Sequence, residues 1–426
     1  IASSGSLDIR PVRTLPKGIS LAKQCNPECD VYLAQGTYVQ SQPLDLAEGV
    51  SLYGGYNTSW AHNRALSAVK INGKVSPTVH ADAITKDTVV SDLTINAPDL
   101  TSPTGAESVA LLVTNTGTQD RLTFRRAQLN GGQGADGADG ADGGIVNANS
   151  PNKKERLAGG AGGASGDCYA NAGSDGGGAV TPFGNGGQAG QSTCPNSCPL
   201  TGHDGISNGG DGFPGILGDF GANGGSASSN RMGRVSGSGN WLPSTSGAGD
   251  DGKRGGAGGG GGAGGTKRIR SCFGCGTLLG GEGGDGGAGG RAGEGGKGGG
   301  QGGAAITVVL VNSTVTFGTT VGVKGGRGGD GGTGGNGRDG EYGLAGDSGA
   351  SGNSTKCGAV WYHSGDGGRG GKGAEGGGGA AGAGGNGGPA IGLAEVGTSS
   401  TKGSPSYTAG TPGSGGSAGT PGAYKS

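Results

Sequence analysis

The stretch E-G-G-D-G-G-A-G-G-R-A-G-E-G-G-K-G-G, residues 282–299, sets the pattern for much of this chain. Non-glycine residues recur there at every third position, and again from 327 to 342 and from 366 to 375. A polyproline-II helix has three residues per turn and no internal hydrogen bonds. The X residues of G-G-X then line one edge, and the two bare edges let neighbouring helices approach and exchange backbone hydrogen bonds. The pattern predicts a bundle of polyglycine helices held together backbone to backbone.

Two other structures compete for these tracts. A flexible linker is the usual fate of such a sequence, because ordering the backbone costs about 1–2 kcal/mol per residue in entropy. A collagen-like helix fits residues 131–143, where glycine keeps a strict G-x-y phase. However, the chain has only 17 prolines and most runs are G-G-X, unlike the proline-rich collagen repeat. We therefore prefer the polyglycine bundle.

Composition argues against several classes of partner. The formal net charge is −1 and 15% of residues are charged, so there is no electrostatic reason to expect nucleic acid. The longest apolar run, residues 306–311, is far shorter than the roughly 20 residues of a membrane-spanning helix. The four histidines are far apart, and no metal or cofactor motif stands out. The first residue is isoleucine, and we expect an extracellular or cell-surface protein from which a signal peptide has been removed.

The eight cysteines form an even set, which in a glycine-rich chain with few core residues favours disulfides and an oxidising compartment. The close pairs are Cys25 with Cys29, Cys194 with Cys198, and Cys272 with Cys275, which leaves Cys168 and Cys357 to join distant segments. A redox-active C-F-G-C at 272–275 and a zinc site are the alternatives, but no thioredoxin-like pattern and no second C-x-x-C accompanies them. The connectivity cannot be read from the sequence.

Residues 1–130 have the pattern of a capped β domain. Residues 11–23 predict a short amphipathic helix with Thr14 as N-cap and Pro16 in the first turn. Leu15, Ile19 and Ala22 share one face of this helix. Short β-rich runs follow, punctuated by Gly, Asn, Asp or Pro. They cover residues 31–39, 49–53, 69–73, 88–96, 109–114 and 121–129.

One β unit recurs along the chain. Residues 109–129 and 305–324 each hold two β runs that lead into a glycine run, and residues 389–396 begin a third copy. Such a unit cannot bury its apolar face alone, so the copies should stack. We expect an all-β fold: a small parallel β-helix, or solenoid, with a short N-terminal capping helix and an inserted bundle of polyglycine-II helices. The expected divisions are 1–130 (cap and coils), 131–303 (first glycine-rich insertion), 304–324 (rung), 325–388 (second insertion) and 389–426 (final rung and Gly/Ser/Pro-rich tail).

Three stretches carry a resemblance to a known family: R-T-L-P-K-G-I-S-L-A at 13–22, V-Y-L-A-Q-G-T-Y at 31–38 and G-V-S-L-Y-G-G-Y at 49–56. They resemble the N-terminal cap and first coils of bacterial right-handed parallel β-helix surface proteins of the pectin-lyase-like type. The resemblance extends over about residues 7–130 and 305–323, and it implies a fold and a cell-surface setting rather than one activity. The glycine-rich part is similar in type to the polyglycine-II bundles of springtail antifreeze proteins and of phage tail-fibre tip adhesins.

Many β-helix proteins of this type cleave polysaccharides, so carboxylates near the coils are candidate catalytic groups. The candidates are Asp82, Asp87, Asp92 and Asp99, with Arg125 and Arg126 on a later strand. Catalysis would need paired carboxylates on one face, and this spacing fits turn residues equally well. No family motif falls on a particular position, so we expect no enzyme. A cation bound by Asp136, Asp139 and Asp142 is left open.

The X residues of the glycine runs mix Asp, Glu, Lys, Arg, Asn, Thr and Ala, which indicates a solvated face rather than the flat array of an ice-binding surface. Large aromatic residues lie between the runs. Those taken as candidate binding loops are Trp241, Phe273, Trp361 and Tyr362. The alternative is that such residues are apolar plugs that close the bundle.

Together these patterns predict a secreted, non-enzymatic structural protein of the cell surface or of an extracellular assembly: a spacer, a filament subunit or an accessory layer. It would need no cofactor, and its partners would be other surface proteins or copies of itself. The alternative is an adhesin that binds a glycan or a surface receptor through the aromatic loops. An ice-binding protein and a polysaccharide lyase are further alternatives.

Overall fold

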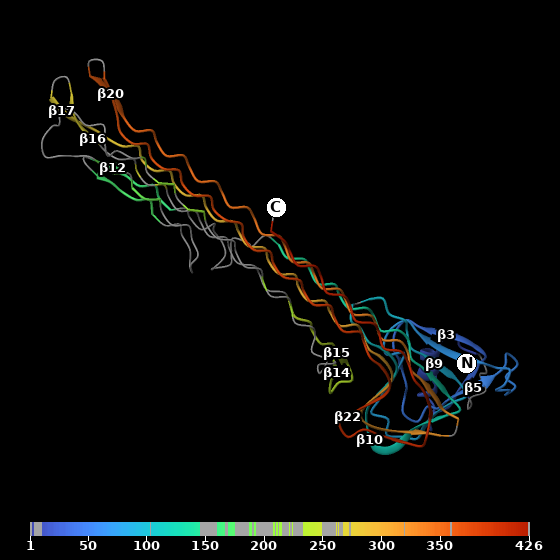
Figure 1. The fold of residues 1–426 in the computed structure, drawn as a ribbon. Helices are drawn as coiled ribbons and strands as arrows, with labels where there is room; N and C mark the ends of the chain where they lie inside the picture. Colours follow the sequence, from blue (N-terminus) through green and yellow to red (C-terminus); the bar gives the residue numbers. More distant parts are fainter. Residues whose placement is uncertain are drawn as a thin grey trace.

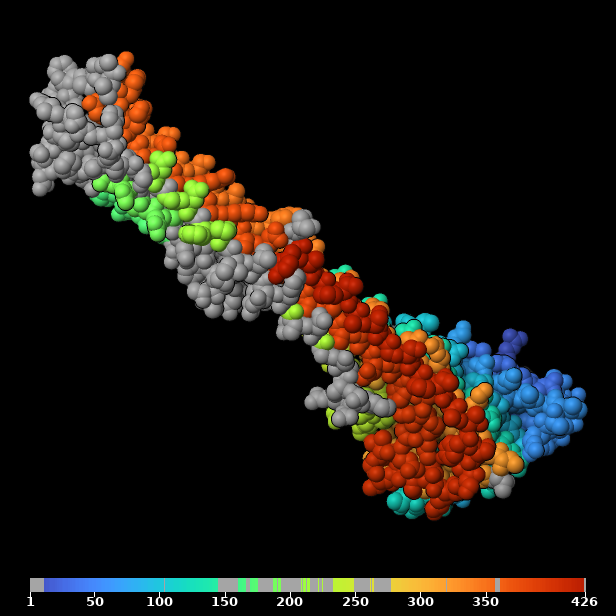
Figure 2. All heavy atoms as spheres, in the orientation of Figure 1, coloured from blue at the N-terminus to red at the C-terminus, as the bar shows by residue number. Residues whose placement is uncertain are grey.

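The computed structural model describes part of the chain, and the statements below concern that part. The described residues are 2–3, 11–102, 104–144, 160–166, 169–174, 187–189, 191–192, 208, 210–211, 213–214, 221, 224, 233–248, 261, 263, 267–271, 274–318, 320–357 and 360–424. The molecule is a base of β-strands from which a long rod projects (Figure 1). The space-filling view shows the base and the rod as one continuous body (Figure 2).

Helix α1 (Leu15–Ala22) covers the start of the base, as predicted. Leu15, Ile19 and Ala22 are buried, and they pack against the first strands. Pro16 lies in the first turn, where a missing N–H costs nothing. Thr14 has the extended conformation of an N-cap, but its hydroxyl makes no capping hydrogen bond. The position of the helix is therefore confirmed, while the predicted role of the Thr14 side chain is not seen.

The base consists mainly of β-strands that pair almost entirely in parallel, which confirms the all-β part of the expected fold. Its ten-stranded sheet contains β1 (Ala2–Ser3), β2 (Val31–Ala34), β4 (Leu44–Asp45), β5 (Leu52–Tyr56), β7 (Val79–Asp82), β8 (Thr88–Ser91), β10 (Ser108–Arg125), β18 (Ala305–Phe317), β22 (Ala390–Val396) and β23 (Ser400–Lys402). Its six-stranded sheet contains β3 (Gly36–Gln40), β6 (Val69–Gly73), β9 (Thr94–Asn96), β11 (Gln128–Asn130), β19 (Gly322–Lys324) and β24 (Ser406–Thr408).

The two sheets enclose an apolar core. Inward side chains alternate along the strands, and the same position recurs from strand to strand because the pairing is parallel and in register. Phe124 lies beside Phe317 with 6.0 Å between the ring centroids. Leu111 pairs with Val308, and both are fully buried. The predicted second copy of the β unit therefore stacks directly on the first, although 174 residues (131–304) separate β11 from β18.

The longest described glycine-rich runs of the rod are five, and we name them by residue: run A (131–144), run B (281–303), run C (325–352), run D (365–388) and run E (410–424). Each continues directly from a strand of the base or leads directly into one (Figure 1). Runs A, C and E follow β11, β19 and β24, whereas runs B and D lead into β18 and β22. Run E was expected only as a Gly/Ser/Pro-rich tail, and its place in the rod was not predicted.

Over residues 328–336, run C uses the three amides of each turn for three different neighbours. Gly331 N–H donates to the Ser414 carbonyl of run E at 2.8 Å, and Gly332 N–H donates to the Gly300 carbonyl of run B at 2.9 Å. Thr333 N–H donates to the Asp139 carboxylate of run A at 2.8 Å. Run D in turn donates to run C at every third residue, as in the bond from Gly385 to Gly332. The contacts of the rod are therefore largely backbone to backbone with a repeat of three residues.

The register of the base carries on into the rod. Asn130 pairs with Lys324, and Lys324 pairs with Thr408, where the last strands of the base end. One turn further, Gln133 bridges to Arg327, which bridges to Thr411. The same offsets between chains are still present at Asn336, whose N–H donates to Asp142 and whose amide oxygen accepts from Thr420 N–H. The stacked strands of the base therefore set the alignment of the glycine runs.

A hairpin of β14 (Arg234–Val235) and β15 (Trp241–Leu242) lies at the junction of base and rod (Figure 1). Trp241 packs against Val109, Val309 and Val311 on the outer face of β10 and β18. The buried Gln301 of run B accepts hydrogen bonds from Ser244 through its side-chain oxygen, at 2.6 Å from the backbone N–H and 2.8 Å from the hydroxyl. The hairpin thus covers apolar surface that the strands alone would leave open.

Candidate functional site at the distal end of the rod

Two antiparallel hairpins stand at the far end of the rod (Figure 1). One consists of β16 (Lys267–Ser271) and β17 (Gly274–Leu278), and the other of β20 (Ser354–Cys357) and β21 (Val360–His363). A smaller pair, β12 (Ser165–Gly166) and β13 (Tyr169–Ala170), lies just below them (Figure 1). We call the first two hairpins the tip.

The stems of the two tip hairpins are bonded to each other. Ser364 is buried at the foot of β21, and its hydroxyl donates to the Leu279 carbonyl at 2.5 Å. Its backbone N–H donates to the Asn353 carbonyl at 2.9 Å, and Asn353 N–H donates to Leu279 at 3.2 Å. Run C therefore enters the tip, turns through β20–β21 and returns as run D beside the stem of β16–β17. These hydrogen bonds fix both tip hairpins to the end of the rod.

The outward face of β20–β21 carries a row of three side chains. Lys356 pairs with Trp361 across the hairpin, and Ser354 pairs with His363, so Lys356, Trp361 and His363 share one face. The Lys356 ammonium lies 5.7 Å from the centroid of the Trp361 ring. The rings of Trp361 and His363 are 6.2 Å apart and inclined by only 21°. Trp361 is 54% exposed, which is high for an indole.

The four candidate binding loops have different environments. Trp361 is exposed at the tip, and Tyr362, on the opposite face of the hairpin, is half-buried. Trp241 is only 6% exposed and lies at the other end of the rod, against the base, where it acts as an apolar plug. Phe273 lies outside the described residues. The structure thus leaves Trp361 as the exposed aromatic of this set.

The carboxylates considered for catalysis each have a separate partner. Asp82 accepts from Thr114 and Asn115, and these hydrogen bonds lower its pKa. Asp87 pairs with Arg121 at 2.8 Å. Asp99 accepts the backbone N–H of Gln133 at 2.9 Å. These groups therefore serve to join successive strands and turns.

Asp92 is the buried member of that set. Burial alone would raise its pKa, but hydrogen bonds from Arg126 and Ser91 outweigh burial and lower it. Arg126 makes two bonds to the carboxylate, at 2.8 Å and 2.7 Å, and Arg64 approaches to 3.8 Å. Asp92 and Arg126 both have positive φ angles, at the corners that follow β8 and β10. The pair thus links two stacked corners, and the predicted Arg125 lies at the end of β10.

The row Asp136, Asp139 and Asp142 turns its carboxylates toward run C. They accept the backbone N–H groups of Asp330, Thr333 and Asn336 at 2.8, 2.8 and 2.7 Å. The backbone N–H and the hydroxyl of Thr333 lower the pKa of Asp139. The cation considered for this row from the sequence is therefore replaced by amide donors, and the row acts as a side-chain lock between runs A and C.

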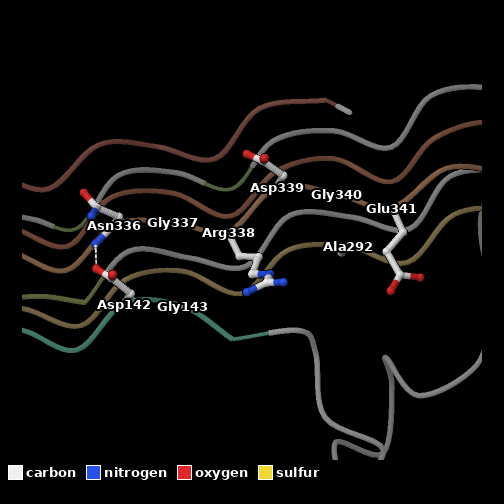
Figure 3. A pocket seen from close by; sticks show the side chains of 9 residues that line it. All are labelled: Asp142, Gly143, Ala292, Asn336, Gly337, Arg338, Asp339, Gly340 and Glu341. Atoms are coloured by element: carbon white, nitrogen blue, oxygen red, sulfur yellow. Dashed lines mark hydrogen bonds between the residues drawn. The ribbon is translucent and has the colours of Figure 1, made fainter. Parts of the chain in front are cut away.

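A shallow pocket of about 310 Å³ opens on the side of the rod near the end of run A. Figure 3 shows Arg338 and Glu341 at its lining, with Asp142 bonded to Asn336 at one end. Ala292 occupies a glycine position of run B and also lines the pocket. No aromatic residue is among the described residues of its lining. Residues 145–159, which follow Gly144, lie outside the described residues, so this pocket is not taken as the site.

Cys25 and Cys29 form a disulfide just after α1, which confirms one of the three close pairs. The backbone of Cys275 lies in β17 and that of Cys357 in β20, both in the tip. Cys168, Cys194, Cys198 and Cys272 lie outside the described residues. For the other six cysteines, the disulfide pairing remains open, as in the sequence analysis.

Comparisons with models of protein families, with curated proteins and with solved structures find no match to this chain. The resemblance to pectin-lyase-like surface proteins therefore remains a proposal. Within the part of the chain that the structure describes, no helix has both the length and the apolar character needed to cross a membrane.

Proposed function

We propose that this protein is a non-enzymatic spacer of an extracellular surface or assembly, in which a small parallel β-helix is the base and a polyglycine-II bundle carries the tip away from it. The observation that supports this most is the backbone hydrogen-bond network, which repeats every three residues along all five runs. At about 3.1 Å per residue, run C alone reaches roughly 85 Å. A rod with these contacts needs few side chains, which leaves its tip as the part that meets a partner.

The polyglycine-II assignment is supported by the way glycine is used. A Cβ added at Gly335 would lie 2.0 Å from the Ala141 carbonyl oxygen, and one at Gly340 would lie 1.8 Å from the Gly376 oxygen. Side chains at these positions would force the runs apart and break their hydrogen bonds. The assignment therefore explains both the composition and the phase of the runs.

The parallel β-helix is supported by three ladders that recur in the same order. Strands β7, β8 and β9 pair in parallel with the two arms of β10 and with β11, and these pair with the two arms of β18 and with β19. Strands β22, β23 and β24 complete the series. Asn115, Asn312 and Gly397 follow the first ladder with positive φ angles, which indicates the same corner in each turn.

A spacer is favoured over a filament subunit by the two ends of the base. Helix α1 covers the first strands. At the other end, Glu395 pairs with Leu310 and Thr401 pairs with Val315, so polar residues take positions that are apolar core one turn earlier. Inward-pointing charge on an edge strand opposes pairing with another chain. The edge strands at the two ends of the base are therefore protected from pairing with the edge strands of another molecule.

An oxidising, extracellular location is supported by the Cys25–Cys29 disulfide, since such bonds persist mainly outside the cytosol. The carboxylates of the base support a structural role, because Asp82, Asp87 and Asp92 are each engaged by neighbouring side chains. The proposal needs no cofactor and assigns no catalytic residue.

Light scattering with negative-stain microscopy tests the proposal on the purified full chain. We expect monomers with a compact base and a single straight projection. The double variant Glu395→Leu, Thr401→Val is the matched control, and it should promote end-to-end association because it restores an apolar edge. Filaments formed by the unmodified chain, or particles without a projection, would contradict the spacer.

A further inference from the structure

The charges of the tip differ from those of the rod behind it. Neither tip hairpin contains an acidic residue, whereas β16 contributes Lys267, Arg268 and Arg270, and β20 contributes Lys356. The runs just behind the tip mix both signs at their X positions, with Glu282, Asp347 and Asp366 beside Arg369 and Lys372. The tip is therefore basic although the chain as a whole has a formal net charge of −1.

The exposed face of β20–β21 combines two kinds of recognition. The face of an indole carries partial negative charge and attracts the C–H groups of a sugar ring. The Lys356 ammonium lies over that ring, 5.7 Å from its centroid, in reach of an anionic substituent of a sugar that packs against the exposed part of the indole. The His363 ring stacks against the indole at 6.2 Å between centroids and an inclination of 21°, and so adds to the aromatic surface of this row. An exposed aromatic surface with a cation held on it matches a sugar that bears a sulfate or a carboxylate.

The geometry points to the row Lys356–Trp361–His363 as a binding site for an anionic saccharide, a sulfated or uronic-acid-containing glycan. This inference rests on the proposed function only in that the rod must hold the tip outward. The residues of this site lie in the tip hairpins, whereas the hydrogen bonds that support the spacer lie in the rod.

A nucleic acid is less well matched by the same surface. Proteins that bind single strands without sequence preference use a basic groove with several aromatic side chains along it. The described tip row has one exposed indole, and acidic X residues begin immediately behind it at Asp366, which follows β21 by three residues. A long phosphate backbone would meet that negative charge, whereas a few sugar units would fit on the row.

Biolayer interferometry on the full chain tests the inference with a sulfated heparin octasaccharide, a neutral maltooctaose and a thymidine oligonucleotide of matched charge, at 50 and 300 mM NaCl. We expect the sulfated octasaccharide to bind most tightly and to bind less well at the higher salt concentration. Trp361→Ala should weaken its binding by about tenfold or more. Lys356→Gln removes the charge but keeps a long polar side chain. It should weaken binding of the sulfated octasaccharide by about threefold and reduce the salt dependence of that binding.

Tyr342→Ala is the matched control, because Tyr342 is an exposed aromatic residue on the side of the rod, and its removal should leave the affinity unchanged. The inference is overturned if the sulfated octasaccharide does not bind at 50 mM NaCl, if both tip variants bind as the unmodified chain does, or if the oligonucleotide binds as tightly. Negative-stain images of the same samples separate the two proposals. Straight rods without glycan binding overturn only the tip assignment, whereas collapsed rods overturn the spacer.

Discussion

At the scale of single residues, glycine in the rod is required for lack of space rather than for backbone freedom. The glycines of runs B, C and D face carbonyl oxygens of neighbouring runs. A Cβ added at Gly373 would lie 2.1 Å from the Ala288 carbonyl oxygen, and one added at Gly376 would lie 1.9 Å from the Arg291 carbonyl oxygen. The X positions between them point outward, as exposed Lys372 does. The three-residue period therefore reports packing directly.

Two adjacent substitutions to alanine separate these classes of position. Gly373→Ala should destabilise the protein by about 1–3 kcal/mol, as overpacking does in well-packed interiors. Lys372→Ala introduces the same side chain one residue earlier, and should change stability by no more than about 0.5 kcal/mol because that position is exposed. Denaturant unfolding followed by circular dichroism compares the two. Equal effects would show that the glycines are not packed against backbone.

Acid should weaken the lock between runs A and C. Hydrogen bonds from Thr333 lower the pKa of Asp139 in the folded state, so the carboxylate stabilises the fold above the ordinary aspartate pKa. That contribution is lost as the pH falls through the lowered folded-state value. Asp139→Asn keeps an acceptor oxygen, as Asn336 does for Thr420, and should remove this part of the pH dependence. Asp139→Ala should be less stable than the unmodified chain at neutral pH.

Thermal unfolding between pH 2 and 7 measures this contribution in the three proteins. The unmodified chain should lose more stability below pH 4 than Asp139→Asn does. A parallel pH dependence in both would mean that the Asp139 carboxylate is not held by run C.

At the scale of elements, the number of glycines per turn reports how many sides of a run are packed. Central run C is mostly G-G-X and is bonded to runs A, B, D and E. Run A keeps one glycine per turn, and its Ala138 and Ala141 are exposed. Run E likewise keeps one, with exposed Pro412 and Pro421. The collagen-like phase of run A therefore marks a run at the edge of the rod.

Deletions within run C test whether phase matters more than length. Deleting Gly334 alone shifts the phase of run C by one residue beyond that point. Side chains from X positions would then face the close contacts that glycines make now, and the rod beyond the deletion should be lost. Deleting residues 334–336 keeps the phase, so the rod should persist with β20–β21 drawn back by about 9 Å. Negative-stain length distributions distinguish the two. Rods of equal order after both deletions would contradict the register argument.

Much of the fold was predictable because it depends on local patterns. The apolar face of Leu15, Ile19 and Ala22 specified α1, and the three-residue period specified extended, close-packed runs. The role of run E was missed because an edge run needs fewer glycines and looks like a tail. The candidate site was harder to predict, because the sequence around Trp241 and Trp361 does not show which of the two side chains is buried. The mostly apolar stretch 305–311, in which Thr307 is the one polar residue, was the available signal that β18 is covered on both faces, and Trp241 helps to cover it.

At the scale of the whole molecule, the base acts as a template for the rod. Its parallel strands leave at one edge with fixed offsets, and those offsets persist to Asn336 and beyond. Chain direction alternates between runs: A, C and E lead outward, whereas B and D return. Each long excursion therefore begins and ends in the stacked strands, and the tip hairpins are the turning points.

Amide hydrogen exchange of the runs tests the central claim most directly. If runs C and D are ordered by backbone hydrogen bonds, peptides from 325–352 and 365–388 should exchange slowly, with protection approaching that of β10 and β18 in the base. Complete exchange of these peptides within seconds, while the base remains protected, would show that they are flexible linkers and would contradict the account.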